Sequence, residues 1–420
     1  MSGRALLWGA ALLVALSAPA AGEEAAALSL VRLQQTDTLP EESYGCIRCH
    51  ADKRRSFLLG VHSERGIRCH DCHGGTPATF EQDAAHRGAF IGTPGKARTV
   101  QLCASCHADP DRMRQFSLPT GQLAEFRTSR HGRLLLERRN TDAPSCTDCH
   151  DAHTVLPPSD ARSSVYPTTI PSTCARCHQD RDLMGKYGLP TDQLEEYRRS
   201  AHGVALFERE NFAAPTCIGC HGSHAALPPA VSEIKNVCGR CHVWVRQDFE
   251  RGPHGSATRA GGPVGCTDCH SNHGTERVPI DEISDTCLTC HEEDTRAAIV
   301  GEEIQEQVIA ATRDMHDADS AIAQLVRNGE FVTDQRFRYQ TALTAYLHIG
   351  HVQHSMDLDR LEGLTRQVGS ISRDLRRAAA TSEERRWEHK LLLIPVWFLA
   401  FSAVVLAWLK LRTLGQEKRE

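Results

Sequence analysis

The segment CTDCHDAH, from Cys146 to His153, contains residue types that hold metals or prosthetic groups. The same arrangement, CxxCHxxH, returns at 217–224 and at 266–273. Two cysteines three positions apart can supply half of a zinc site, take part in disulfides or attach a haem. The number of cysteines and the histidines around them distinguish these possibilities.

All 18 cysteines of the 420-residue chain lie in CxxCH motifs, two in each of nine motifs, so none remains for a disulfide. In such a motif the two thiols bind the vinyl groups of one haem, and the adjoining histidine reaches the iron from the proximal face. Neither a zinc site nor a disulfide needs that histidine. The pattern therefore predicts nine covalently bound haem c groups. The predicted attachment residues are Cys46, Cys49, Cys69, Cys72, Cys103, Cys106, Cys146, Cys149, Cys174, Cys177, Cys217, Cys220, Cys238, Cys241, Cys266, Cys269, Cys287 and Cys290. The predicted proximal iron ligands are His50, His73, His107, His150, His178, His221, His242, His270 and His291.

The composition agrees with a core built from haem. Only 5% of the residues are aromatic and 24% are charged, which argues against a large conventional apolar core. The nine motifs lie within the 246 residues from Cys46 to His291, about 27 residues for each. We expect short helices and loops wrapped around the porphyrins. The net charge of -5 and the absence of a basic tract exclude nucleic acid as a partner.

The other histidines supply candidate sixth ligands. Nine of the 23 histidines are proximal, and nine of the remaining 14 lie inside the haem region. Two nitrogen ligands leave an iron no vacancy for substrate, so this balance favours electron transfer over catalysis. The predicted distal ligands are His62, His70, His86, His131, His153, His202, His224, His254 and His273. His153 is expected to bind the iron of a neighbouring haem. His70 lies between the cysteines of its own motif, so Met113, Met184, a C-terminal histidine or an open site stays an alternative to it.

An internal repeat fixes the positions of these histidines. Residues 116–158 align without gaps to 187–229, at an offset of 71 residues and with 23 of 43 positions identical. A diverged third copy covers 254–291. Each repeat unit contains a histidine followed by glycine, then a CxxCHxxH segment and, further on, a plain CxxCH motif, and such units bury their haems by stacking on their neighbours. Thr120 and Thr191 are predicted to cap the short helix before the histidine.

Both ends of the chain carry apolar segments. Residues 1–22 have one positive residue, an apolar run and small residues, the layout of a secretory signal peptide, with an uncleaved anchor as the alternative. Residues 391–409 are 19 residues without a charge, enough for a transmembrane helix rather than a buried soluble one. Export of the body then predicts a single-pass protein of the inner membrane, with residues 413–420 in the cytoplasm.

The cysteine-free segment after the motifs reads as a helical bundle over 296–380, which separates the haem domain, 40–295, from a C-terminal helix at 381–412. Apolar residues recur at helical spacing along a first helix that ends at Asn328-Gly329. A second helix is predicted from Asp334 to about His354, and a third from about Asp357 to Arg377. These stripes are Ile304, Val308, Ala311, Met315, Ala318, Ile322 and Leu325 on the first helix, and Leu361, Leu364, Val368, Ile371 and Leu375 on the third.

Two features of this segment complete the prediction. Thr381 and Glu384 form a capping box for the last helix. Three histidines, His348, His351 and His354, follow each other at every third position of the second helix. One of them can serve as a further haem ligand, or the three can line a quinol pocket or lie on the surface. A surface position is favoured.

The nine motifs, the paired histidines and the anchor resemble membrane-anchored multihaem c-type cytochromes of the doubled-CxxCH, cytochrome c3-like type. The resemblance covers residues 40–295. It implies a mainly α fold with much irregular loop around a row of haems, followed here by a bundle and one transmembrane helix. It also implies electron conduction between a quinol pool, or cytochrome b-type or iron-sulfur quinol oxidoreductase subunits, and periplasmic or outer-membrane cytochromes and other acceptors.

Two related groups fit less well. Small quinol dehydrogenases of periplasmic nitrite and nitrate reduction have an N-terminal anchor and four or five haems, unlike this chain. A multihaem reductase or oxidoreductase of small nitrogen or sulfur compounds, with one open haem site, is the alternative function. No CxxCK replaces a CxxCH motif here, which favours the electron-transfer role.

Overall fold

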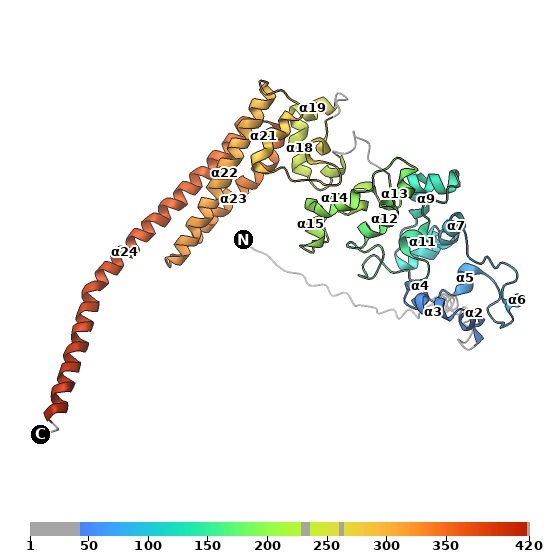
Figure 1. Ribbon diagram of the computed structural model, residues 1–420, viewed down its shortest axis with the longest axis horizontal. Coiled ribbons are helices and arrows are strands. Elements are labelled where there is room, and N and C mark those ends of the chain that lie inside the picture. Colours follow the sequence, from blue (N-terminus) through green and yellow to red (C-terminus); the bar gives the residue numbers. More distant parts are fainter. Residues whose placement is uncertain (1–42, 228–235, 260–263, 418–420) are drawn as a thin grey trace, which may run out of the picture. The chain divides into compact units, whose positions relative to one another are not determined.

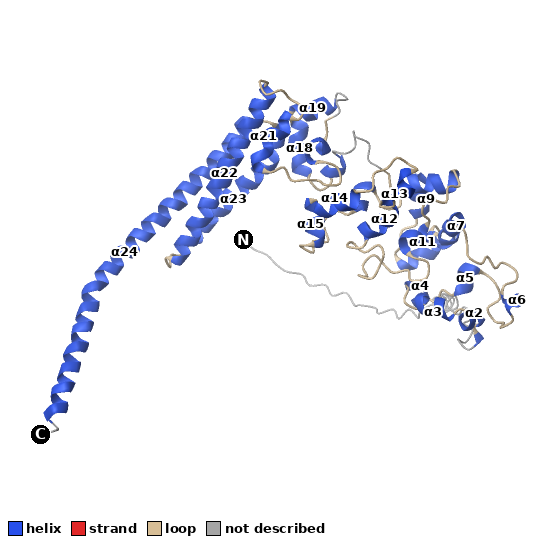
Figure 2. Cartoon of the chain, viewed as in Figure 1, coloured by secondary structure: helices blue, strands red, loops and turns tan. Residues whose placement is uncertain are grey.

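The computed structural model describes residues 43–227, 236–259 and 264–417, so the predicted signal peptide at 1–22 lies outside it. Throughout these described ranges the chain forms helices and loops and no strand (Figures 1 and 2). This confirms the predicted mainly α fold with much irregular loop. The structure divides into two units, one containing 43–102 and 151–156 and the other containing 103–150 and 157–417.

The first unit consists of short helices, two of which carry CxxCH motifs. Its backbone is closed by hydrogen bonds between segments far apart in sequence. The Gly45 amide donates to the Pro77 carbonyl at 2.8 Å, and the Val61 amide donates to the Val155 carbonyl at 2.9 Å. The second of these bonds brings the segment after His150 into the unit. The helices are α2 (Gly45–Cys49), α3 (Ala51–Phe57), α4 (Val61–Glu64), α5 (Cys69–His73) and α6 (Gln82–Ala85), and α7 (Lys96–His107) begins here.

The second unit continues the chain of motifs with equally short helices. Few of them exceed two turns, so their stability cannot come from helix formation alone, which is marginal below about 12–15 residues. These helices are α8 (Pro110–Met113), α9 (Gln122–Thr128), α10 (Arg130–Gly132), α11 (Cys146–His150), α12 (Ile170–His178), α13 (Arg181–Gly185), α14 (Gln193–Arg199), α15 (Ala201–Phe207), α16 (Cys217–His221), α18 (Val243–Arg251), α19 (Pro253–Arg259), α20 (Cys266–His270) and α21 (Ile283–Leu288).

Three long helices follow in the same unit: α22 (Arg296–Arg327), α23 (Thr333–Val352) and α24 (Leu358–Glu417). Their apolar stripes face one another. The predicted stripes are confirmed, because their residues are either buried or packed against the two apolar clusters of the bundle. The first helix ends as predicted, with Asn328 as its C-cap and Gly329 at a φ of 82°. Glycine adopts this left-handed conformation without the steric cost that a side chain adds.

The predicted break between a third helix and a last helix is wrong. Helix α24 runs for 60 residues without interruption, so Thr381 and Glu384 lie inside it and do not form a capping box. Because the buried stripe of α24 continues through Ser382, packing against α22 favours a continuous helix over the local capping signal. Figure 1 shows this helix passing from the bundle to the C-terminus.

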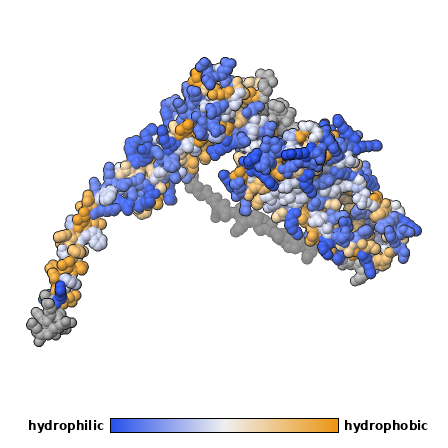
Figure 3. Space-filling view, in the orientation of Figure 1, coloured by the Kyte–Doolittle hydropathy of each residue, from blue (hydrophilic) through white to orange (hydrophobic). Residues whose placement is uncertain are grey.

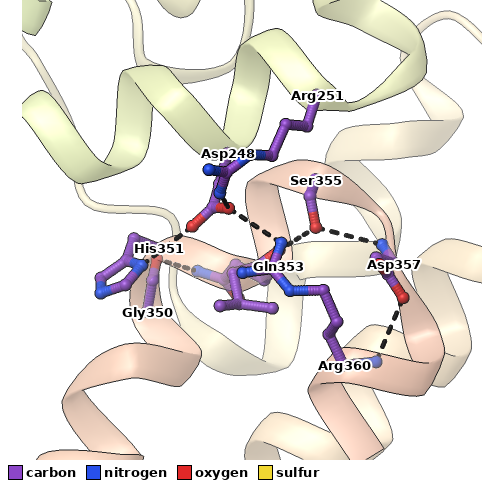
Figure 4. A network of polar contacts seen from close by, with 9 residues as sticks. Asp248, Arg251, Gly350, His351, Gln353, Ser355, Asp357 and Arg360 are labelled. Atoms are coloured by element: carbon purple, nitrogen blue, oxygen red, sulfur yellow. Dashed lines mark hydrogen bonds and ion pairs between the residues drawn. The ribbon is translucent and has the colours of Figure 1, made fainter.

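The two ends of the bundle differ in what they contact. At one end, Asp248 of α18 accepts hydrogen bonds from Arg251 at 2.9 Å, from Arg360 of α24 at 2.9 Å and from Nδ1 of His351 at 3.0 Å (Figure 4). Asp248 is only 2% exposed, and the hydrogen bonds from its partners lower its pKa although burial alone would raise it. This network ties α18, which directly follows the motif that ends at His242, to the bundle.

At the opposite end, the described contacts join α24 to the end of α22 and the loop that follows it. The side-chain amide (Nδ2) of Asn328 donates to the Ser382 hydroxyl at 3.2 Å, and Arg385 pairs with Glu330 at 3.2 Å. The apolar part of α24 begins just beyond this end. One helix of the described chain, Leu358–Arg412, contains a segment long and apolar enough to cross a membrane, and none of that segment is buried. Figure 3 shows hydrophobic side chains covering this part of α24.

Candidate haem sites

Short helices carry several of the cysteine pairs. The segments CTDCH, CIGCH and CHDCH each form one short helix, α11, α16 and α5. Residues three apart in a helix lie on one face, so both thiols of a motif project to the same side. All 18 cysteines lie in described residues, and no two of them form a disulfide. The geometry required for attaching one porphyrin through two thioethers is therefore present.

Histidine rings from distant segments come together in pairs. Eight pairs have ring centroids 6.1–6.3 Å apart, and each pair contains one histidine of a CxxCH motif. Other ring contacts of the chain spread from 4.4 to 6.4 Å. The pairs of the first unit are His50–His86 and His73–His153. Those of the second unit are His131–His178, His150–His224, His202–His242, His221–His273, His254–His291 and His270–His354.

This spacing fits a metal ion between the two rings. A bond from imidazole nitrogen to a metal ion is about 2.0–2.1 Å long and the nitrogen lies about 1.1 Å from the ring centre, so two imidazoles on opposite sides of one ion have centroids about 6.2–6.4 Å apart. The narrow range of the eight pairs matches that value. An axial histidine pair from two segments can therefore hold an iron at each of these places.

Backbone carbonyls orient several motif histidines. Nδ1 of His73 lies 2.8 Å from the Gly92 carbonyl, and Nδ1 of His270 lies 2.9 Å from the Glu276 carbonyl. A carbonyl only accepts, so each Nδ1 carries the proton and donates it, and Nε2 keeps its lone pair for a metal. Burial also lowers the pKa of the distal candidate His131 to about 4, which keeps its imidazole neutral and able to ligate.

The second histidine of CxxCHxxH is directed away from its own motif by the backbone. The residue after the proximal histidine has a positive φ in all three such cases: Asp151, Gly222 and Ser271, at 60°, 80° and 58°. The chain therefore turns sharply where the motif helix ends. His153 consequently lies beside His73 rather than beside His150, and His224 lies beside His150 rather than beside His221.

The histidine that precedes glycine is positioned by a serine. Ser129 accepts from the Gly132 amide at 2.9 Å and donates to the Phe126 carbonyl at 2.6 Å, and Ser200 makes the same two contacts in the next repeat. A Cβ on Gly132 would come within 1.8 Å of the Phe126 carbonyl oxygen, so only glycine fits. The predicted caps Thr120 and Thr191 are wrong, because Gly121 and Asp192 occupy the N-cap positions without side-chain hydrogen bonds.

Three predicted iron ligands, His62, His70 and His107, do not belong to any of these eight pairs. Nδ1 of His70 lies 3.0 Å from the hydroxyl of Tyr44, whose ring is also its aromatic neighbour. His62 lies on α4 in the first unit, and His107 ends α7 in the second. Burial lowers the pKa of His107.

His354 lies beside His270 although it is not one of the nine predicted distal ligands, and it is a C-terminal histidine of the kind predicted as an alternative to His70. Its ring centroid is 6.1 Å from that of His270, and burial lowers its pKa to about 4. His351, three residues earlier, binds Asp248 instead, and His348 lies next to His351. The sequence signal was present in HIGHVQH, but 84 residues separate His354 from its partner.

Comparisons with known families agree with the motifs. Residues 61–179 match the family model of cytochrome c3, and residues 253–296 match that of the doubled CXXCH motif. No curated protein and no solved structure matches the chain. Together with the thiol pairs and the imidazole pairs, these matches mean that the chain binds haem c covalently. The protein is a multihaem c-type cytochrome with doubled CxxCH motifs and a cytochrome c3-like domain, and it acts as an electron carrier.

Proposed function

We propose that this cytochrome carries nine haems and conducts electrons between a quinol pool or a membrane oxidoreductase partner and periplasmic or outer-membrane acceptors. In this proposal the body lies in the periplasm, α24 anchors it in the inner membrane and the C-terminus is cytoplasmic. The observation that carries the proposal is the set of eight imidazole pairs. Each haem, when bound, supplies an iron that takes up and releases one electron.

The paired imidazoles support conduction rather than catalysis. With both axial positions taken by histidine, an iron has no position at which nitrite or a similar substrate can bind. The pairs also come from segments far apart in sequence, such as His270 with His354. Each pair therefore cross-links two parts of the wrapper and limits the change in geometry that accompanies a change of redox state.

The length of α24 supports an exchange of electrons with protein partners. Arg360, which contacts Asp248 at the motif-bearing end of the bundle, lies 31 residues before Leu391. At 1.5 Å per residue this is about 46 Å along the helix. A quinol that stays inside the bilayer cannot cover that distance. A cytochrome b-type or iron-sulfur subunit, or another partner cytochrome, is therefore the expected donor.

The first test is a count of haems and a spectrum. Pyridine haemochrome analysis with the intact mass of the purified protein is expected to give nine haems. Electron paramagnetic resonance (EPR) of the oxidised protein is expected to show low-spin signals only. A substantial high-spin signal, or rapid reduction of nitrite by the isolated protein, would contradict conduction and favour the enzyme.

A pair of substitutions tests the axial assignment. His354→Ala is expected to turn the haem of Cys266 and Cys269 high-spin, because its ring faces His270. His70→Ala is the matched control and is expected to leave the spin state unchanged, since His70 contacts Tyr44. In the same way, His153→Ala is expected to affect the haem at Cys69 and Cys72, whose proximal histidine is His73. The reverse result for His70 and His354 would refute the assignment.

A further inference from the structure

A carboxylate recurs at one position of the repeat. Glu125, Glu196 and Asp248 each lie six residues before a histidine that precedes glycine, and an aromatic residue follows each of them. They lie on α9, α14 and α18, the helices that lead into those histidines. Each of these helices ends before the short helix that carries the histidine, α10, α15 or α19.

Each of these carboxylates instead faces a histidine from another segment. Oε2 of Glu125 lies 3.7 Å from Nδ1 of His224, and Oε2 of Glu196 lies 3.6 Å from Nδ1 of His273. Because the contact is to Nδ1, Nε2 of both rings stays available for a metal. The distances exceed those of a hydrogen bond, so the interaction is electrostatic.

The third contact follows the pattern with one difference. Asp248 lies 3.0 Å from Nδ1 of His351, which precedes the paired His354 by three residues. Its charge is also compensated by Arg251 and Arg360. The first two carboxylates thus act directly on rings of the pairs, whereas Asp248 serves mainly the joint between the haem region and the bundle.

The first unit provides a contrast within the same chain. The residue six positions before His62 is Ser56, which has no charge. The histidine equivalent to His224 and His273 is His153, paired with His73. Besides its partner His73, the charged groups that act on His153 are Asp52 and Lys53, which form an ion pair at 3.2 Å and oppose each other.

We propose that Glu125 and Glu196 are positioning residues that hold His224 and His273 in orientation and lower the reduction potentials at those two iron sites. The inference rests on the proposed function, because it requires both histidines to be axial ligands. A negative charge near the ring stabilises the ferric over the ferrous state by Coulomb attraction. Carboxylates next to a ligating imidazole also fix the ring and raise its basicity. The site at Cys69 and Cys72, with Ser56 at the equivalent position, then has the higher potential of the three.

The double variant Glu125→Gln/Glu196→Gln of the holoprotein tests this inference by potentiometric titration of the α-band. Two ninths of the absorbance change are expected to move to higher potential. The oxidised-to-reduced ratio of those haems at a fixed potential should fall about threefold to tenfold, where tenfold corresponds to about 59 mV for a one-electron couple. The effect is moderate because the Glu125 and Glu196 side chains are 53% and 38% exposed and the solvent screens them.

Glu195→Gln is the matched control. Glu195 is the neighbour of Glu196 on α14, carries the same charge and pairs with Arg199 at 3.1 Å instead of a histidine. Its titration curve is expected to superimpose on that of the wild type. An equal shift in the control would overturn the inference, because it would reduce the effect to general surface charge.

The converse substitution keeps the inference testable if the double variant does not fold. Ser56→Glu introduces a carboxylate at the equivalent position of the first unit and is expected to move one ninth of the absorbance change to lower potential. Unchanged potentials in the folded variants, with EPR still low-spin, would overturn this inference and leave the proposed function intact. High-spin iron at these sites in the wild type would instead overturn the proposed function.

Discussion

The haem region and the helical bundle are stabilised by different means. Of the buried apolar residues, 11 lie in the described residues from Tyr44 to Phe249 and 17 lie between Ala298 and Ala379. The bundle is about a third as long as the haem region, yet it contains both apolar clusters found in the described chain. A polypeptide with so few buried side chains needs another apolar material for its core. The comparison teaches that the porphyrins stabilise one region and leucine, valine and alanine the other.

The largest expected effect comes from withholding haem. Full-length chain produced in cells that lack cytochrome c maturation is expected to lose the fold of the haem region, since its thiols and histidines then hold nothing together. The bundle should stay folded. Limited proteolysis should therefore leave a fragment beginning near Arg296, and far-UV circular dichroism should retain the signal of the long helices. An equally resistant haem region would contradict the comparison.

A cavity in the bundle should have the second largest effect. Leu361 is 1% exposed and packs in the larger apolar cluster. Leu361→Ala is expected to lower the free energy of unfolding of the bundle by about 2–5 kcal/mol. Thermal unfolding followed by circular dichroism measures this loss, and the visible haem spectrum should not change at room temperature. Leu347→Ala, on the exposed face of α23, is the control and should cost much less.

Asp248 links the two regions, so its substitution should weaken both. Asp248→Asn removes the charge that accepts hydrogen bonds from Arg251, His351 and Arg360. A loss of about 1–3 kcal/mol is expected for a buried acceptor of charged donors. Haem absorbance and circular dichroism should then report a lowered midpoint together. Asp359→Asn, exposed at the start of α24, is the control. A midpoint that shifts for only one of the two probes would argue against a link.

The smallest effect is the dependence of this link on pH. The pKa of Asp248 is lower in the folded protein than in the unfolded chain, where an aspartate titrates near pH 3.9. Its contribution to stability is therefore complete above that value and is lost as the pH falls through the folded pKa. The difference in thermal midpoint between wild type and Asp248→Asn should shrink below about pH 4. A difference that stays constant down to pH 2 would contradict the contribution of the charge.

The sequence by itself determined the chemistry and the long helices. A CxxCH motif is a local arrangement, and two thiols with an adjoining histidine bind haem wherever the motif is placed. The stripe from Ile304 to Leu325 is equally local, because helical periodicity puts those residues on one face. The end of α22 at Asn328-Gly329 and the apolar run of α24 are also visible in the local sequence. Among the long helices, the break at Thr381 was predicted wrongly, because tertiary packing outweighed a capping signal.

The tertiary structure decided which histidines meet. His153 lies beside His73, and His354 rather than His70 lies beside His270. These pairs depend on turns at residues such as Asp151 and Ser271, whose positive φ no spacing rule reveals. They also depend on contacts between segments as far apart as α20 and the short turn Gln353–Ser355 that follows α23. Two histidines can bind one iron only if they lie close together in space, whereas a motif shows only their distance along the chain. The two distances differ because the chain folds back on itself between the two ligands.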